Sequence, residues 1–233
     1  AVLVSVTKGI EDGTMLRMSQ IVEEVTGHKT VVLTGPTHAE EVAKDLPTTI
    51  VAACEDLQVA EKVQDIFSNT CMRVYTNEDV LGVELCGAMK NIMALGSGIA
   101  LGLGYGDNTK AMLMTRGIAE MSRLGVALGG NAETFSGLSG VGDLIVTCIS
   151  QHSRNRRCGL LIGRGMPVAQ ALKEVGAVVE GYYATGAIHR ITQEKGIEMP
   201  ICNAIYQVLY EDVPITKMYS LLVDRPSRSE QEP

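Results

Sequence analysis

The pattern of apolar residues changes once along the chain, near residue 77, and this change limits the fold more than any other feature of the sequence. Before it, short β-branched runs alternate with stretches of helical spacing. Strands that alternate with helices are typical of a mostly parallel sheet with covered faces. We therefore predict an α/β unit over residues 1–77, with strands at 1–6, 30–33, 48–53 and 72–75 and helices at 15–25 and 57–67.

After residue 77, nearly every segment has helical spacing or is a glycine-rich turn. One of these helices should begin with a capping side chain at Asp107 or Asn108 and end at Gly125. The sequence predicts an all-helical domain over residues 78–224 and a disordered polar tail over 225–233. The predicted helices are 80–100, 108–124, 143–149, 154–162, 168–173, 183–195, 201–208 and 216–222.

Composition and charge argue against several classes of partner. The 233 residues carry a formal net charge of −7, and an acidic surface repels phosphate backbones, so no nucleic-acid partner is expected. The apolar stretch 80–103 contains Glu84, Lys90 and Asn91, which are costly in a bilayer, so we expect a buried helix and no membrane span. The six cysteines include no C-x-x-C pair, which favours free, buried thiols in a reducing, cytoplasmic compartment. The four histidines lack metal-ligand spacing, so no metal site is predicted.

Lys90 is the residue most informative about chemistry. Its neighbours one helical turn away, Cys86, Gly87, Met93 and Ala94, are apolar or small. An ammonium in such surroundings either pairs with a carboxylate or ligand or has a lowered pKa, and both outcomes suit a proton donor to a carbonyl oxygen. A lysine at a domain edge that extends its amine to solvent fits the pattern about as well.

Two segments follow predicted strands, at the edge of the sheet where α/β proteins bind ligands. Lys8 comes directly after the first strand, where it can meet an anionic substrate or a cofactor, although an ordinary solvated lysine is the simpler interpretation. Residues 34–39 offer free backbone N–H groups that can hold a phosphate. A plain turn between a strand and a helix explains this second segment nearly as well.

Two further segments precede predicted helices. The glycine-rich loop 137–143 lacks the spacing and the leading strand of a dinucleotide fingerprint, so Asp143 either caps its helix or partners a lysine. Residues 153–157 form a dense basic cluster, and arginine binds phosphate in a bidentate manner. Such a run usually means a solvated turn, but the serine and asparagine within it favour a small phosphate ligand.

Five motifs stand in order along the chain, at residues 83–91, 106–117, 134–148, 153–157 and 178–181. Together they resemble the bacterial-type NAD(P)-dependent glycerol-3-phosphate dehydrogenases, and the resemblance extends from Ala1 to about Leu222. It implies a partial Rossmann-type sheet, incomplete at its N-terminus, followed by an all-α domain of the 6-phosphogluconate dehydrogenase-like type. It also implies reversible hydride transfer between NADH or NADPH and dihydroxyacetone phosphate, which gives sn-glycerol 3-phosphate for glycerophospholipid synthesis, and it makes a homodimer plausible.

The resemblance also implies roles for individual residues. Lys90 matches the proton-transfer lysine of the family. The implied substrate ligands are Lys8, Gly35, Thr37, Lys90, Asp143, Ser153, Arg154 and Asn155. The implied contacts of NAD or NADP are Lys8, Ala39, Arg154, Val178 and Glu180.

The sequence departs from the family pattern in two places. Tyr182 stands where the family usually has valine, beside an implied cofactor contact. The chain begins at Ala1 inside a predicted buried strand, so we expect a glycine-rich strand–turn–helix unit, which holds the cofactor's pyrophosphate, to precede it. Without that unit, we expect little dehydrogenase activity from this polypeptide alone.

Two alternative interpretations stay open. Another dehydrogenase of the 6-phosphogluconate or 3-hydroxyacid superfamily shares the lysine–asparagine helix, although the 153–157 cluster and the loop before Asp143 argue against it. A catalytically inert structural fragment is the second alternative.

Overall fold

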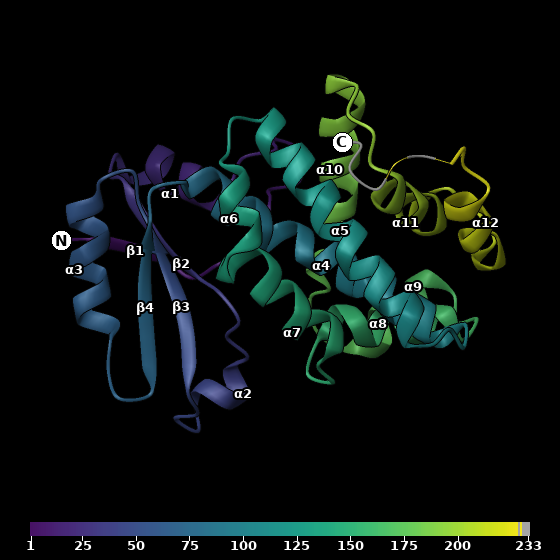
Figure 1. The fold of residues 1–233 in the computed structure, drawn as a ribbon, viewed down its shortest axis with the longest axis horizontal. Coiled ribbons are helices and arrows are strands. Elements are labelled where there is room, and N and C mark those ends of the chain that lie inside the picture. The colour runs from purple at the N-terminus through teal and green to yellow at the C-terminus, as the bar shows by residue number, and fades with distance from the viewer. Residues whose placement is uncertain (228, 230–233) are drawn as a thin grey trace.

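The computed structural model describes residues 1–227 and 229, which form a small α/β layer and a larger group of helices beside it (Figure 1). Most of the tail predicted to be disordered, residues 228 and 230–233, lies outside the described residues. The change from strands to helices comes where the sequence predicts it, since the last strand ends at Asn77 and a long helix begins at Val80.

A four-stranded sheet in the order β1-β2-β3-β4 forms the α/β layer. Strand β1 (Leu3–Ser5) is parallel to β2 (Thr30–Thr34), and β3 (Thr48–Ala53) is parallel to β4 (Met72–Asn77). The middle pair, β2 and β3, is antiparallel, which the prediction of a mostly parallel sheet did not anticipate. Parallel neighbours need a long crossover, whereas the segment between β2 and β3 contains only the four-residue helix α2 (Ala39–Val42), so the chain turns back without crossing.

One face of the sheet is covered by α3 (Leu57–Phe67), on the outer side of the molecule (Figure 1). Val31 and Leu33 of the sheet pack there against Ala60 and Val63 of that helix. The alternating apolar residues of the strands and the 3.6-residue spacing of α3 therefore form one small core between them.

The opposite face of the sheet joins the helical part. Val32 and Val51 pack against Val83, in the first turn of α4 (Val80–Gly102). Helix α4 therefore belongs to both layers and carries its side chains from the sheet into the centre of the helical part.

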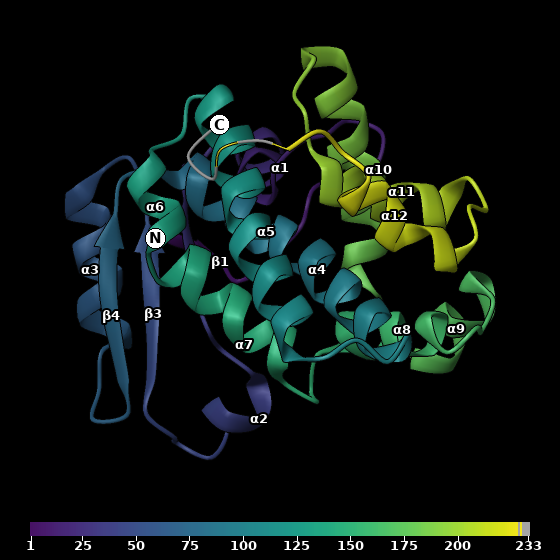
Figure 2. The same ribbon diagram turned by 45° about the vertical axis from the view of Figure 1, so that its right-hand side comes forward.

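Four helices pack around α4, which is buried along almost its whole length (Figure 2). They are α5 (Asp107–Ala127), α7 (Asp143–Ile149), α8 (Arg154–Gly163) and α10 (Glu180–Lys195). By length and composition α4 is apolar enough to cross a membrane, but it is mostly buried inside the structure, as is the core helix of a folded domain. The remaining helices are α1 (Met18–Thr26), α6 (Ala132–Ser136), α9 (Val168–Val175), α11 (Pro200–Tyr210) and α12 (Met218–Val223), with a π-helical turn at Leu138–Gly142 and a 3₁₀ turn at Ile215–Lys217.

Glycines let α8 approach α4 at backbone contact distance. A Cβ atom at Gly98 would lie 2.1 Å from the carbonyl oxygen of Arg156, and one at Gly159 would lie 2.0 Å from that of Leu95. No side chain fits at either position, so this pair of helices has one close packing arrangement. That arrangement fixes where the first residues of α8 point.

Several helix boundaries differ from the prediction: α10, for example, begins at Glu180 and not at residue 183, and the short helices α2 and α6 were not predicted. Met15 has a φ of 62°, in the left-handed region, and α1 begins only at Met18. Helix α5 has no side-chain cap, because its N-cap residue is Gly106, and Asp107, the first residue of the helix, pairs with Lys110 at 2.7 Å. The helix continues to Ala127, beyond the predicted end. All six cysteines are free, and all but Cys71 are buried.

Candidate active site

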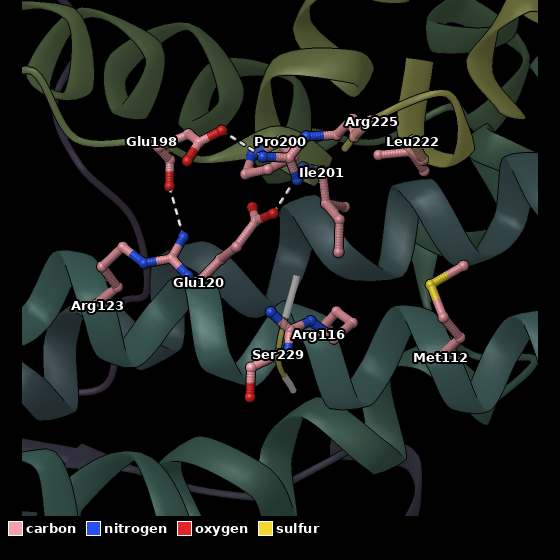
Figure 3. Close-up of a pocket in the computed structure, with 10 residues that line it drawn as sticks. All are labelled: Met112, Arg116, Glu120, Arg123, Glu198, Pro200, Ile201, Leu222, Arg225 and Ser229. Atoms are coloured by element: carbon pink, nitrogen blue, oxygen red, sulfur yellow. Dashed lines mark hydrogen bonds and ion pairs between the residues drawn. The ribbon is translucent and has the colours of Figure 1, made fainter. Parts of the chain in front are cut away.

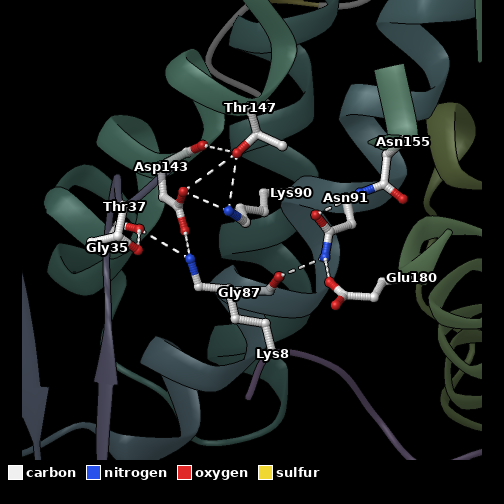
Figure 4. Close-up of polar contacts among 10 residues, drawn as sticks. All are labelled: Lys8, Gly35, Thr37, Gly87, Lys90, Asn91, Asp143, Thr147, Asn155 and Glu180. Atoms are coloured by element: carbon white, nitrogen blue, oxygen red, sulfur yellow. Dashed lines mark hydrogen bonds and ion pairs between the residues drawn. The ribbon is translucent and has the colours of Figure 1, made fainter. Parts of the chain in front are cut away.

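Two lysines from distant parts of the chain meet at one buried carboxylate (Figure 4). Lys8 comes from the loop after β1, Lys90 from the middle of α4, and Asp143 is the first residue of α7. The Lys8 ammonium donates to Asp143 Oδ2 at 2.8 Å, and the Lys90 ammonium donates to Oδ1 at 2.5 Å. The Lys90 and Asp143 side chains are only 8% and 1% exposed. Lys90 therefore does not extend to solvent. Of the two alternatives for Asp143, the structure shows the lysine partner, because no side chain caps the start of α7.

Further hydrogen bonds hold the two ammonium groups in place. Lys90 also donates to Thr147 Oγ1 at 3.0 Å, and that hydroxyl donates to the main-chain oxygen of Asp143 at 2.5 Å. Lys8 donates to the main-chain oxygen of Gly35 at 3.0 Å. Its stem lies against Gly87, where a Cβ atom would come within 3.3 Å of Lys8 Cγ. Both amines thus have fixed positions.

The charges in this cluster shift the acidity of Lys90. Two ammonium groups share the single carboxylate of Asp143. Burial, to which the charge of Lys8 adds, lowers the pKa of Lys90 to about 8, although Asp143 acts in the opposite direction. Lys90 is therefore mostly charged at neutral pH and can lose its proton just above it, as a proton donor to a carbonyl oxygen must.

A second polar cluster lies on the other side of α4 (Figure 4). Asn91 donates to Glu180 Oε2 at 2.8 Å and accepts from Asn155 Nδ2 at 2.9 Å. Asn155 in turn accepts from the main-chain N–H of Gly181 at 2.8 Å. A Cβ atom at Gly181 would lie 2.5 Å from the Asn91 carbonyl oxygen, so the close approach of α10 to α4 holds these amides in register.

A pocket of about 390 Å³ joins the two clusters. Lys8, Lys90 and Arg154 all line it, as do Asn155 and Glu180. The Arg154 guanidinium lies 3.8 Å from Glu180 Oε1, with about half of its side chain exposed. The buried amine and the arginine therefore face one pocket, lined by positive charge and by hydrogen-bonding amides that suit a small anionic ligand.

Most of the residues singled out from the sequence meet at this pocket. Seven of them line it, namely Lys8, Thr37, Lys90, Ser153, Arg154, Asn155 and Glu180. Gly35 and Asp143 reach it through their contacts with Lys8. Ala39 and Val178 are not among its lining residues, and Val178 is 61% exposed.

The basic cluster 153–157 divides between structural and pocket-facing roles. Ser153 Oγ accepts from the main-chain N–H of Arg156 at 3.2 Å and so caps α8. The Arg157 guanidinium donates to the main-chain oxygen of Val175 at 2.5 Å and fastens α9. Only Arg154 of the three arginines lines the pocket.

Sequence reasoning missed six residues that line the pocket, namely Val6, Thr7, His38, Asn91, Thr147 and His152. Asn91 and Thr147 have a recognisable signal, since one follows Lys90 directly and the other stands one helical turn after Asp143. His38 and His152 carry no such signal, because they meet only through the fold. Among the described residues, no group of three or more His, Cys, Asp or Glu side chains could hold a metal ion.

Glu120 lies in a different, smaller pocket of about 140 Å³ (Figure 3). Its carboxylate accepts from the main-chain N–H groups of Ile201 and Cys202 at 2.7 and 3.2 Å, at the start of α11. Burial raises the pKa of Glu120 to about 7. A carboxylate at a helix N-terminus stabilises that helix, so this contact fastens α11 to α5.

The fold and the lysine-lined pocket together define a two-part α/β dehydrogenase. In this class the carboxyl edge of the sheet holds a nucleotide, and the adjoining helical domain supplies the substrate side. Family models support this assignment along almost the whole chain. Residues 1–60 match the model for the N-terminus of NAD-dependent glycerol-3-phosphate dehydrogenase, and residues 79–220 match the model for its C-terminus.

Individual relatives agree with the family models. The chain is 52% identical over 231 residues to a glycerol-3-phosphate dehydrogenase [NAD(P)+] of Clostridium perfringens, covering 99% of this chain and 70% of the relative. It is 53% identical over 231 residues to one from Moorella thermoacetica, covering 99% and 69%. The crystal structure of a Coxiella burnetii glycerol-3-phosphate dehydrogenase superimposes with a TM-score of 0.91 at 38% identity, over 97% of this chain and 69% of that one. The chain belongs to the NAD-dependent glycerol-3-phosphate dehydrogenase family.

Proposed function

We propose that this chain interconverts dihydroxyacetone phosphate and sn-glycerol 3-phosphate. Family membership makes it an NAD(P)-dependent oxidoreductase that acts on a CH–OH group. The observation that carries the choice of substrate is the shared pocket, in which the Lys90 amine and the Arg154 guanidinium both face the same space. One group suits a carbonyl oxygen and the other a phosphate, and the proposed substrate carries both.

The residues of this chain divide the work between binding and proton transfer. Arg154 and Asn155 hold the phosphate by charge-assisted hydrogen bonds, and this binding positions the carbonyl beside Lys90. Lys90 donates a proton to the carbonyl oxygen as negative charge develops there. Asp143 and Thr147 orient Lys90, and Lys8 adds a second positive charge near the same oxygen. In the oxidative direction the neutral Lys90 amine takes the hydroxyl proton.

The residues on the sheet side fit NAD or NADP. When bound, the reduced cofactor supplies the hydride that the carbonyl carbon accepts. Lys8 follows β1 and Thr37 follows β2, so the pocket meets the carboxyl ends of these parallel strands, where α/β folds bind nucleotides. We assign the cofactor contacts to Lys8, Ala39, Arg154, Val178 and Glu180. The exposure of Ala39 and Val178 supports this assignment, because a ligand larger than the pocket must extend over such positions.

The domain boundaries, the location and the assembly belong to the same proposal. Residues 1–77 would be the nucleotide-binding part and residues 78–224 the catalytic part, which is supported by the switch from strands to helices between Asn77 and Val80. Six free cysteines support a reducing, cytoplasmic setting. Association into a homodimer rests on the resemblance alone and is tested by light scattering after size-exclusion chromatography.

Ligand binding tests the substrate assignment on the 233-residue chain itself. Millimolar glycerol 3-phosphate should raise the midpoint of thermal unfolding, and 6-phosphogluconate should not. An Arg154→Met variant should lose most of the rise, while an Arg73→Met variant, changed on the exposed edge strand β4, should keep it. The absence of any rise would favour an inert fragment, and a rise with 6-phosphogluconate alone would reverse the choice of substrate.

Turnover is measured on the same chain and on a chimera. In the chimera, this chain replaces the matching residues of the Clostridium perfringens relative, of which it covers 70%. NADH oxidation with dihydroxyacetone phosphate by the chimera, lost in its Lys90→Met variant, is the expected result. The low turnover expected of the polypeptide alone stays a prediction that this pair of assays addresses.

A further inference from the structure

Two histidines meet at the edge of the pocket, one from each layer of the fold. His38 stands between β2 and α2, and His152 stands in the loop between α7 and α8. Their ring centroids lie 6.0 Å apart, with the ring planes tilted by 57°. Both line the pocket that also contains Lys90 and Arg154. The pair therefore brings side chains of both layers together in the lining of the pocket.

One nitrogen of this pair has unused hydrogen-bonding capacity. The Nε2 atom of His38 is buried and has no hydrogen-bond partner among the described residues. A buried polar atom without a partner costs free energy that a ligand atom can recover. Lys8, Lys90 and Asn155, which line the same pocket, already donate to protein oxygens.

The cations around the pair already have carboxylate partners. Three cations line the pocket, and they are Lys8, Lys90 and Arg154. Asp143, which does not line the pocket, pairs with both lysines, and Glu180, which does, lies beside the arginine. Glu40 of α2 lies outside the lining, and its pKa is held below its ordinary value by its own backbone and, to a smaller extent, by His152, His38 and Arg154. A phosphate ester brings a charge of about −1.5 to −2, which these already paired cations balance only in part.

Imidazole is the side chain that can supply the missing charge near neutral pH. We propose that His38 and His152 form an ionisable clamp for the substrate phosphate, and that binding of the phosphate dianion is coupled to proton uptake by this pair. The imidazolium N–H groups donate to phosphate oxygens, alongside Arg154. This inference rests on the proposed function.

Isothermal titration calorimetry measures the proposed proton uptake directly. Glycerol 3-phosphate is titrated into the 233-residue chain at pH 7.0, in two buffers that differ in their enthalpy of ionisation. At this pH Lys90, whose pKa is lowered to about 8, is already mostly protonated, so its contribution is small. The parent chain should take up about 0.5–1 proton per ligand more than a chain that lacks the two histidines.

Variants of the histidines show which side chains take up the proton when the ligand binds. A His38→Gln/His152→Gln chain should lack this additional uptake and bind about threefold to tenfold more weakly, because hydrogen bonds to charged donors are the stronger ones. A His28→Gln chain, changed at an exposed position in the turn after α1, is the matched control and should equal the parent. Since the phosphate itself titrates near pH 6, only differences between variants at one pH are compared. If the double variant does not fold, His152→Gln alone, at an exposed side chain, should lose about half of the uptake.

The outcomes separate this inference from the proposed function. Binding by the parent without proton uptake, or with uptake that the double variant retains, overturns the clamp and leaves the substrate assignment standing. A parent chain that does not bind glycerol 3-phosphate overturns both.

Discussion

Replacing Asp143 with asparagine removes the carboxylate that Lys8 and Lys90 share. The Asp143 side chain is 1% exposed and accepts from both amines, at 2.8 and 2.5 Å. Removing one partner of a buried ion pair typically costs about 3–5 kcal/mol, because the other charge stays buried. Lys8 is 17% exposed and can recover part of this through water, so the cost comes chiefly from Lys90. We expect the free energy of unfolding to fall by about 3 kcal/mol in Asp143→Asn.

Urea unfolding followed by circular dichroism at pH 7 measures this loss as a shift of the midpoint at constant slope. Asp107→Asn is the matched control, because Asp107 pairs with Lys110 but is 96% exposed. Water screens an exposed pair and leaves it little effect on stability, so this control should stay close to the parent. Equal losses in the two variants would refute the reasoning that the Asp143 pair is buried and shared.

Three further predictions address packing and pH. Gly159→Ala should destabilise the chain by about 1–3 kcal/mol in urea unfolding, because the new methyl group would lie 2.0 Å from the Leu95 carbonyl oxygen. Gly106→Ala, which has open space around the new methyl group, is the control and should not destabilise the chain. Equal effects of the two variants would argue against the close α4–α8 contact. The pKa of Lys90 is lowered from 10.5 to about 8 in the folded chain, so the unfolded chain binds this proton more tightly. The free energy of unfolding should therefore rise between pH 8 and pH 10.5 by an amount on the order of 3 kcal/mol. A Lys90→Met variant that kept this rise would show that Lys90 is not its source. Burial raises the pKa of Glu120 from 4.5 to about 7, so the folded chain binds that proton more tightly than the unfolded chain. The contribution of Glu120 to the free energy of unfolding therefore falls as the pH rises from 4.5 to about 7. Glu120→Gln should remove this fall, and an unchanged pH profile of unfolding would show that Glu120 is not its source.

The elements with strong periodicity are those that the sequence predicts well. β3, α3 and α7 begin and end where the apolar pattern places them. β3 is a β-branched run whose last four residues are buried, and α3 begins directly after Asp56, whose side chain caps it. The antiparallel pairing of β2 with β3 was missed, because strand direction depends on where the intervening chain travels and not on local pattern. The late start of α1, at Met18, was missed because Met15 adopts a left-handed conformation that its residue type does not predict.

The candidate site shows the same division. Lys90 was recognised because a charge among apolar helix neighbours needs an explanation that is visible in the sequence. The partner of Lys90 could be named only as one of two alternatives for Asp143, since 53 positions separate the two residues along the chain. His38 and His152 come together only through the packing of the two layers, which no spacing rule encodes.

The account depends most on Lys90 and Arg154 acting on the two ends of one ligand. The crystal structure of the chain with bound glycerol 3-phosphate tests this directly. The phosphate should contact Arg154, and the oxygen on carbon 2 should lie within about 3.2 Å of Lys90 Nζ. A ligand bound elsewhere, or one that reaches Arg154 while carbon 2 points away from Lys90, would contradict it.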